Sequence, residues 1–140
     1  RKLLILAREC GLDIELEDIA IESMVPQALR DIPLDEFLAR VTEMDDVMSA
    51  QFNQAAHSNE VVRYVAQFER VNEQCIASVG LQQLANDHAL ASLTPSDNVF
   101  LVKSQWYQDN PLIIRGPGAG REVTAAAIES DLYTLIKELI

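Results

Sequence analysis

The chain has 140 residues, of which 49% are hydrophobic, so it has enough apolar side chains for the core of one globular domain. Its formal net charge is −11, which argues against nonspecific binding to nucleic acid or to an anionic membrane, because both need a basic patch. No apolar run is long enough for a membrane-spanning helix, so we expect neither a nucleic-acid nor a membrane partner.

The two cysteines, Cys10 and Cys75, lie in apolar contexts. They do not form a C-x-x-C pair and the chain has no histidine cluster, so we expect no metal site. Reduced thiols fit a cytoplasmic protein, and the sequence alone leaves a disulfide between the two cysteines as the alternative.

The first expected element is a helix over residues 1–10, with Gly11 suited to its C-terminal end. Arg1 opens this helix without an initiator methionine and without a capping residue before it. Because natural domains rarely start inside a helix, we expect the chain to be a fragment of a longer protein.

A short strand is expected over residues 19–25, ended by Pro26. Helix-start signals follow over residues 31–36, where Pro33 precedes two acidic residues. The next apolar residues recur at spacings of three and four: Phe37, Val41, Met44, Met48 and Phe52. This spacing predicts one amphipathic helix of about 20 residues that ends near Ser58.

Residues 61–68 and 75–81 both alternate between apolar and polar positions, which predicts two strands of an antiparallel hairpin. Val62, Tyr64, Ala66 and Phe68 are expected on one face of the first strand, and Cys75, Ala77, Val79 and Leu81 on one face of the second. A third strand is expected over residues 98–107, closed by Trp106 and Tyr107.

The stretch that organises the rest is a strand at residues 112–114, a glycine turn at residues 116–120 and a closing helix with an apolar stripe. The turn does not match the dinucleotide fingerprint Gly-x-Gly-x-x-Gly, because Arg121 follows Gly120. On the glycines alone, a tight structural turn and a close approach to an anionic ligand are the two readings.

These elements predict an α+β fold with a largely antiparallel or mixed sheet of about five strands and helices packed on one face. Four apolar residues would lie on the other face: Val61, Val65, Val99 and Leu101. We therefore expect a second subunit to cover that face.

Four strings resemble homoserine dehydrogenases: RKLLILARE (1–9), VVRYVA (61–66), DNVF (97–100) and NPLIIRGPGAGREVTA (110–125). The resemblance covers the whole chain. It is strongest to the C-terminal part of the bifunctional aspartokinase/homoserine dehydrogenases of the methionine branch (type II).

The resemblance implies NAD(P)-dependent interconversion of L-aspartate-4-semialdehyde and L-homoserine in the biosynthesis of threonine and methionine. It places Lys2 at the family's catalytic lysine and Gly120 at a glycine that contacts NADP or NAD. It also implies a homodimer formed through the sheet. Residues 1–110 would belong to the catalytic and dimerisation domain, and residues 111–140 would return to the nucleotide-binding domain.

The same resemblance implies that the Rossmann domain, the acidic substrate-binding residues and the sodium site all precede Arg1. We therefore expect the 140 residues alone to be inactive and to bind no cofactor tightly. The alternative functions are a non-catalytic dimerisation module and a regulatory module that binds a small molecule.

Overall fold

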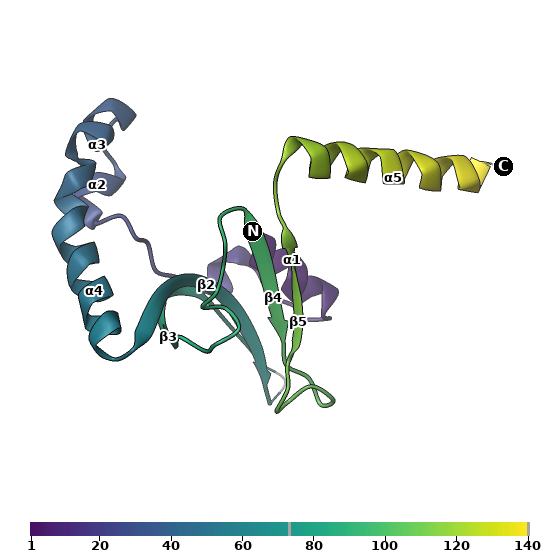
Figure 1. Ribbon diagram of the computed structural model, residues 1–140, viewed down its shortest axis with the longest axis horizontal. Coiled ribbons are helices and arrows are strands. Elements are labelled where there is room, and N and C mark those ends of the chain that lie inside the picture. Colours follow the sequence, from purple (N-terminus) through teal and green to yellow (C-terminus); the bar gives the residue numbers. More distant parts are fainter. Residues whose placement is uncertain (73, 140) are drawn as a thin grey trace. The chain divides into compact units, whose positions relative to one another are not determined.

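The computed structural model describes residues 1–72 and 74–139, which belong to two compact units, residues 1–86 and residues 87–140. The first unit contains α1 (Lys2–Glu9), η1 (Leu16–Asp18), β1 (Ile19–Ile21), α2 (Gln27–Arg30), α3 (Leu34–Arg40), η2 (Val41–Met44), α4 (Asp45–His57), β2 (Glu60–Val71) and β3 (Gln74–Ala85) (Figure 1). The second contains β4 (Asp97–Val102), β5 (Leu112–Pro117) and α5 (Arg121–Leu139). Within the described ranges, no helix combines the length and apolar character needed to cross a membrane.

The sheet of the first unit has the strand order β1-β3-β2. β2 and β3 pair antiparallel along their whole length, and β1 pairs parallel to β3. The predicted hairpin is confirmed. Its predicted face is confirmed too, because Phe68 pairs with Ala77 and Tyr64 pairs with Leu81, and directly paired residues share a face.

The core of the first unit lies between α1, the segment after it and this face of the sheet. Six residues form the buried cluster: Leu3, Ala7, Leu12, Ile14, Ile19 and Ala77. Four partly buried side chains pack against it: Leu4, Phe68, Cys75 and Val79. The predicted α+β class with a helix on one sheet face is therefore confirmed.

The single helix predicted over residues 31–58 is wrong. α3 ends at Arg40, a 3₁₀ turn follows at Val41–Met44, and α4 begins at Asp45. Val41 and Thr42 are β-branched, which lowers their preference for the α-helix, whereas Asp45 and its acidic neighbour favour the start of a new one.

The single sheet of about five strands is also corrected. The described residues form five strands in two sheets, because β4 and β5 pair only with each other in an antiparallel ladder. Val99 and Leu101, which were expected on the second face of one large sheet, lie in this separate ladder. Alternation of residue types predicts strands but not which strands pair, so the sequence could not separate the sheets.

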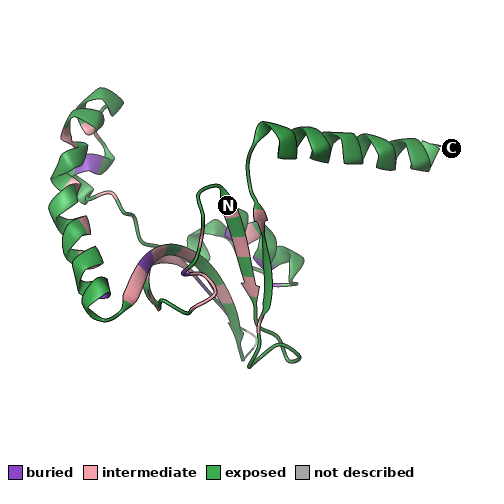
Figure 2. Ribbon diagram, viewed as in Figure 1, coloured by how far each residue is buried: buried purple, intermediate pink, exposed green. Residues whose placement is uncertain are grey.

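The third predicted strand is shorter than expected, because β4 ends at Val102. Trp106 and Tyr107 lie beyond it in a turn closed by two backbone hydrogen bonds between Ser104 and Tyr107. β5 then leads through the glycine turn into α5, on which no residue is buried (Figure 2). The proposed functional boundary after residue 110 stays a prediction, since the compact units divide the chain by contact rather than by function.

Candidate functional site

Helix α1 carries one candidate residue, Lys2, and its buried face and its C-terminal end are fixed by contacts within the first unit. Leu3 and Ala7 are buried one turn apart, so they hold one face of the helix on the sheet. At the far end Gly11 has φ +75°, a left-handed conformation that favours glycine, and the Leu12 amide donates to the Ala7 carbonyl at 3.0 Å.

Two arginines fix the segment after α1. The Arg70 guanidinium of β2 donates to the Cys10 and Gly11 carbonyls, both at 3.3 Å. Arg8 donates through Nε to the Ile14 carbonyl at 3.1 Å, and its Nη2 lies 2.6 Å from a Glu15 carboxylate oxygen. The helix is thereby tied to the sheet by main-chain and side-chain contacts as well as by its apolar face.

Lys2 is the first residue of α1 and is exposed. Its neighbour Leu3 is buried, so the backbone that carries Lys2 is fixed while the ammonium group faces away from the core. An ammonium group on a fixed helix end can donate hydrogen bonds to an oxygen of a bound substrate and exchange a proton with it.

The glycine turn, in the second unit, carries the other candidate residue. β5 ends at Pro117, and α5 begins at Arg121. Gly120 has φ +141°, which side chains rarely allow, and its carbonyl accepts the Thr124 amide at 3.0 Å. A Cβ added at Gly120 would meet only Val123 at 3.9 Å among the described residues, so the second unit leaves space beside this backbone.

A loop that the sequence analysis did not connect with this turn lies against it. We call residues Thr94 to Asn98 the 94–98 loop. Its Ser96 carbonyl accepts the Gly118 amide at 2.8 Å, which extends the β4–β5 ladder beyond Pro117. A Cβ added at Gly118 would collide with the side-chain amide of Asn98.

Asp97 is the polar centre of the 94–98 loop. Its Oδ2 accepts the Thr94 hydroxyl at 2.6 Å and the Arg115 Nε at 2.8 Å. These two hydrogen bonds, the Thr94 bond foremost, hold the pKa of the Asp97 carboxyl below its usual value, because both favour the charged form. The signature-like string that begins at Asp97 was visible in the sequence, but its contact with residues about 20 positions later was not.

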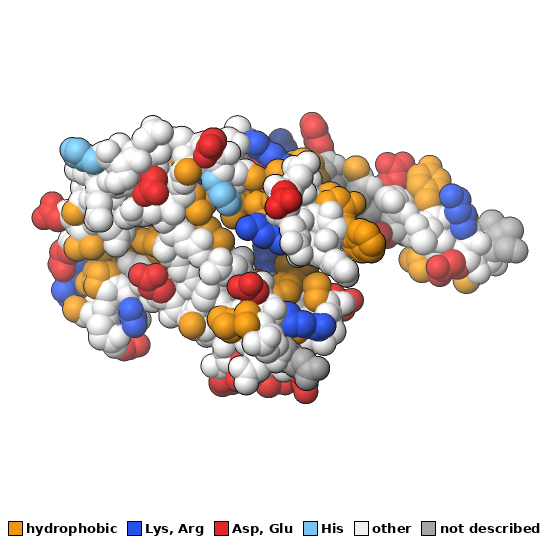
Figure 3. Space-filling view, turned by 90° about the horizontal axis from the view of Figure 1, so that it is seen from below, with side chains coloured by type: hydrophobic (Ala, Val, Ile, Leu, Met, Phe, Trp, Pro, Cys, Tyr) orange, Lys and Arg blue, Asp and Glu red, His pale blue; other side chains and the backbone are white. Residues whose placement is uncertain are grey.

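The two predicted site residues belong to different units. Lys2 lies in the first and Gly120 lies in the second, and each is described within its own. No group of three or more His, Cys, Asp and Glu side chains that could hold a metal ion is present in residues 1–72 and 74–139. Acidic side chains are scattered over the face shown in Figure 3, with hydrophobic side chains exposed among them.

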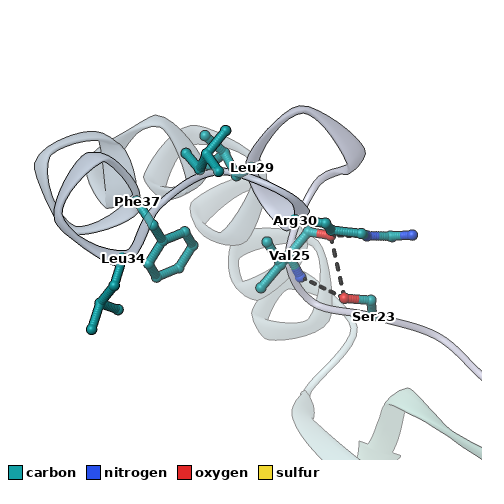
Figure 4. A pocket seen from close by; sticks show the side chains of 7 residues that line it. Ser23, Val25, Leu29, Arg30, Leu34 and Phe37 are labelled. Carbon is teal, nitrogen blue, oxygen red and sulfur yellow. Dashed lines mark hydrogen bonds between the residues drawn. The ribbon is translucent and has the colours of Figure 1, made fainter.

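Two shallow hollows lie in the first unit, and neither includes Lys2. One is lined by Ser23, Val25, Leu29, Arg30, Ile32, Leu34 and Phe37. Arg30 extends away from the Phe37 ring (Figure 4), and its Nε donates to the Val25 carbonyl at 2.7 Å. The other lies beside β1 and β3, at residues 20–22 and 78–82. Neither hollow gathers groups that indicate a reaction.

Comparisons with known proteins give a consistent result. The family model described as Homoserine dehydrogenase matches residues 1–133. The chain is 46% identical over 139 residues to bifunctional aspartokinase/homoserine dehydrogenase 2 of Escherichia coli (strain K12), covering 99% of the chain and 17% of that protein. It is 40% identical over 145 residues to the homoserine dehydrogenase of Emericella nidulans, covering 99% of the chain and 39% of that protein.

Comparison with solved structures also finds similar folds. A Candida auris protein of unknown function has a TM-score of 0.83 at 38% identity, over 97% of this chain and 38% of that one. Staphylococcus aureus homoserine dehydrogenase at pH 7.0 has a TM-score of 0.68 at 19% identity, over 99% of this chain and 30% of that one, and this likeness shows the fold alone. The chain thus spans well under half the length of these relatives.

Proposed function

Since the chain belongs to the homoserine dehydrogenase family, we propose that it supplies the catalytic region of an enzyme that interconverts L-homoserine and L-aspartate-4-semialdehyde with NADP or NAD. The observation that carries the proposal is the family match over residues 1–133, which includes both Lys2 and the glycine turn. The reaction belongs to the biosynthesis of the aspartate-derived amino acids threonine and methionine.

Lys2 is the proposed catalytic residue. When bound, the nicotinamide accepts or supplies the hydride at the substrate carbon. The neutral Lys2 amine accepts the hydroxyl proton when homoserine is oxidised, and the ammonium returns a proton to the oxygen when the aldehyde is reduced. The ammonium also stabilises the negative charge that develops on that oxygen. The exposed position on a fixed helix end supports this role.

Gly120 is the proposed cofactor contact. The open space beside its backbone and the positive φ that excludes most side chains support an approach by a dinucleotide at this turn. The first turn of α5 follows directly, and its N–H groups favour a negatively charged group such as a phosphate. The residues present therefore fit the group, although we expect the 140 residues alone to bind it weakly and to lack dehydrogenase activity.

Residues 111–140 are proposed to return the chain to the nucleotide-binding domain. The apolar stripe of α5 supports this assignment, because the second unit buries none of it: Val123, Ile128, Leu132, Leu135, Ile136 and Leu139. An apolar stripe of this length is typical of a helix that packs on another surface.

We also propose that the enzyme is a homodimer formed through the first sheet. The face opposite the core carries Val61, Val65 and Ile76, and Ile76 is 62% exposed. Val61 and Val65 are half-buried, so Ile76 is the exposed apolar residue of the three, and an interface here would fit the alternative function as well, a dimerisation module without catalytic residues. The proposed cytoplasmic location rests on the two cysteines, both of which are free thiols.

The test is Lys2→Ala in a polypeptide that carries these 140 residues together with the remaining dehydrogenase regions. We expect kcat for homoserine oxidation to fall about 10²-fold or more, the size of a lost general acid–base group. Steady-state kinetics with NADP and with NAD measures the effect, and circular dichroism checks the fold. Lys137→Ala, which removes an exposed lysine from the last turn of α5, is the matched control and should leave kcat within about twofold.

A normal kcat in Lys2→Ala would remove Lys2 from the mechanism. Val65→Asp tests the proposed dimer by itself, because a charge on the sheet face should dissociate it whichever function is right, and Lys2→Ala then separates the two functions. A dimerisation module predicts dissociation with Lys2→Ala silent, whereas the enzyme predicts that Lys2→Ala abolishes turnover in an intact dimer. Sedimentation velocity measures the dimer.

A further inference from the structure

Residues 94–97 of the 94–98 loop form a hydrogen-bonded β-turn. Pro95 and Ser96 occupy its central positions, and the Asp97 amide donates to the Thr94 carbonyl at 3.1 Å. Ser96 has φ +72°, the sign that a type II turn requires at its third position and that glycine usually supplies. A serine held in this conformation shows that the surrounding contacts fix the turn.

The contacts that fix the 94–98 loop lie on both faces of the β4–β5 ladder and along its backbone, and they connect the loop with the glycine turn. On one face, Arg115 of β5 donates through Nε to the Asp97 carboxylate and through Nη2 to the Thr94 hydroxyl at 3.4 Å. On the other, the Asn98 side chain fills the space that a side chain at Gly118 would need. In line with the strand, the Ser96 carbonyl holds the Gly118 amide.

We propose that Asp97 and Asn98 are positioning residues for the cofactor, which act by holding the backbone at Gly118 so that Gly120 and the start of α5 lie where the dinucleotide binds. This inference rests on the proposed function of Gly120. Asp97 fixes the 94–98 loop, the loop fixes Gly118, and Gly118 stands two residues before Gly120.

A purely structural role explains the arrangement less well. The Arg115 side chain is 37% exposed and the Asp97 side chain 20% exposed, and ion pairs with this much access to solvent contribute little to global stability. The contacts made by Arg115, by the Asn98 side chain and by the Ser96 carbonyl all meet at one short turn. They limit the movement of that turn, which lowers the entropy lost when a ligand binds there.

The test compares Asp97→Asn with wild type in the polypeptide that includes the remaining dehydrogenase regions. Asp97→Asn keeps the side-chain shape but removes the charge that Arg115 meets. We expect KM for the nicotinamide cofactor to rise about tenfold, because the loosened turn must be ordered when the cofactor binds, while kcat changes by less than about twofold. A structural role alone would lower the amount of active enzyme without changing KM for the cofactor.

Glu43→Gln is the matched control. It breaks an ion pair of the same kind, in which Arg40 Nε lies 2.7 Å from Glu43 in the first unit, far along the chain from the glycine turn. KM for the cofactor should be unchanged in this variant. Amide hydrogen exchange supplies a second readout, because the Gly118 amide should exchange faster in Asp97→Asn and as in wild type in Glu43→Gln.

Gly120→Ala, measured in parallel, separates failure of this inference from failure of the proposed function. If Gly120→Ala raises KM for the cofactor and Asp97→Asn does not, the positioning role is wrong and the cofactor contact stands. If Gly120→Ala leaves KM unchanged, both are wrong. Should Asp97→Asn fail to fold, Thr94→Val removes the 2.6 Å hydroxyl bond to the same carboxylate and carries the same expectation.

Discussion

Helices α1 and α5 both carry an apolar stripe, yet only α1 buries it. Leu3 of α1 is 6% exposed, whereas Leu132 of α5 is 55% exposed. Figure 2 shows α5 in the colour of exposed residues along its length. The second unit offers α5 no surface to pack on. A helix in a protein owes most of its stability to tertiary packing of its apolar face, so the same pattern gives a fixed element in one unit and an unpartnered one in the other.

The difference bears on the two candidate residues, each within its own unit. Lys2 sits on the packed helix, so its backbone is fixed by contacts within the first unit. Gly120 precedes the unpartnered helix, so within the described residues its position depends on the β4–β5 ladder and the 94–98 loop. The proposed cofactor contact, Gly120, therefore needs contacts outside these residues more than the proposed proton-transfer residue, Lys2, does.

The largest expected effect comes from breaking the packing of α1. Leu3→Ala should lower the free energy of unfolding by about 3 kcal/mol, because it removes a buried side chain and leaves a cavity. Ile5 lies on the same helix but is 61% exposed, so Ile5→Ala should change the free energy of unfolding by less than about 0.5 kcal/mol. Urea unfolding followed by circular dichroism measures both, and equal losses would contradict the burial pattern.

A smaller effect is expected at α5, and it depends on what surrounds the helix. In the 140-residue chain, Leu132→Asp should change the free energy of unfolding by less than about 0.5 kcal/mol, since this side chain is already exposed. In the longer polypeptide it should cost about 2 kcal/mol or more, because a charge would be buried. Asp131→Asn, at the exposed position next to Leu132, is the control. Equal effects in both backgrounds would contradict the proposed packing.

The smallest expected effect concerns the pKa of two carboxyl groups, one from an ion pair in each unit. A hydrogen bond from Arg40 lowers the pKa of Glu43, and bonds from Thr94 and Arg115 lower that of Asp97. A lowered pKa in the folded state adds stability above the ordinary values of 4.5 and 3.8, and this stability is lost as the pH falls through the folded pKa. Carboxyl titration by NMR should show both midpoints below those values, and Arg115→Ala should raise only that of Asp97, and only in part, because the stronger Thr94 hydrogen bond remains.

Much of the local structure was predictable from the sequence. The alternation in β2 and β3 specified the hairpin and its core face, because one face must be buried and a shift by one residue would reverse it. The break between α3 and α4 was missed, because the apolar spacing continues through Val41. The β-branched side chains of Val41 and Thr42 lower the preference for an α-helix at this point, where the structure has a 3₁₀ turn. The two separate sheets were missed because strand patterns carry no information about their partners.

The candidate site was predictable only where a continuous string carried the information. Lys2 and Gly120 were identified through motifs that resemble the family, and their roles remain proposals. The contact of the 94–98 loop with Gly118 had no such signal. Nothing in the spacing of Thr94 and Pro95 indicated that their segment would meet residues about 20 positions later.

The sequence by itself determined α1, α5, the hairpin, the glycine turn and the membership of the family, because each depends on residues close together in the chain. Only the tertiary structure decided that α1 is packed and α5 is not, that two sheets form, and that Asp97 and Asn98 contact the glycine turn. These features depend on which distant segments meet, and that choice is made by the burial and hydrogen bonding of the whole unit.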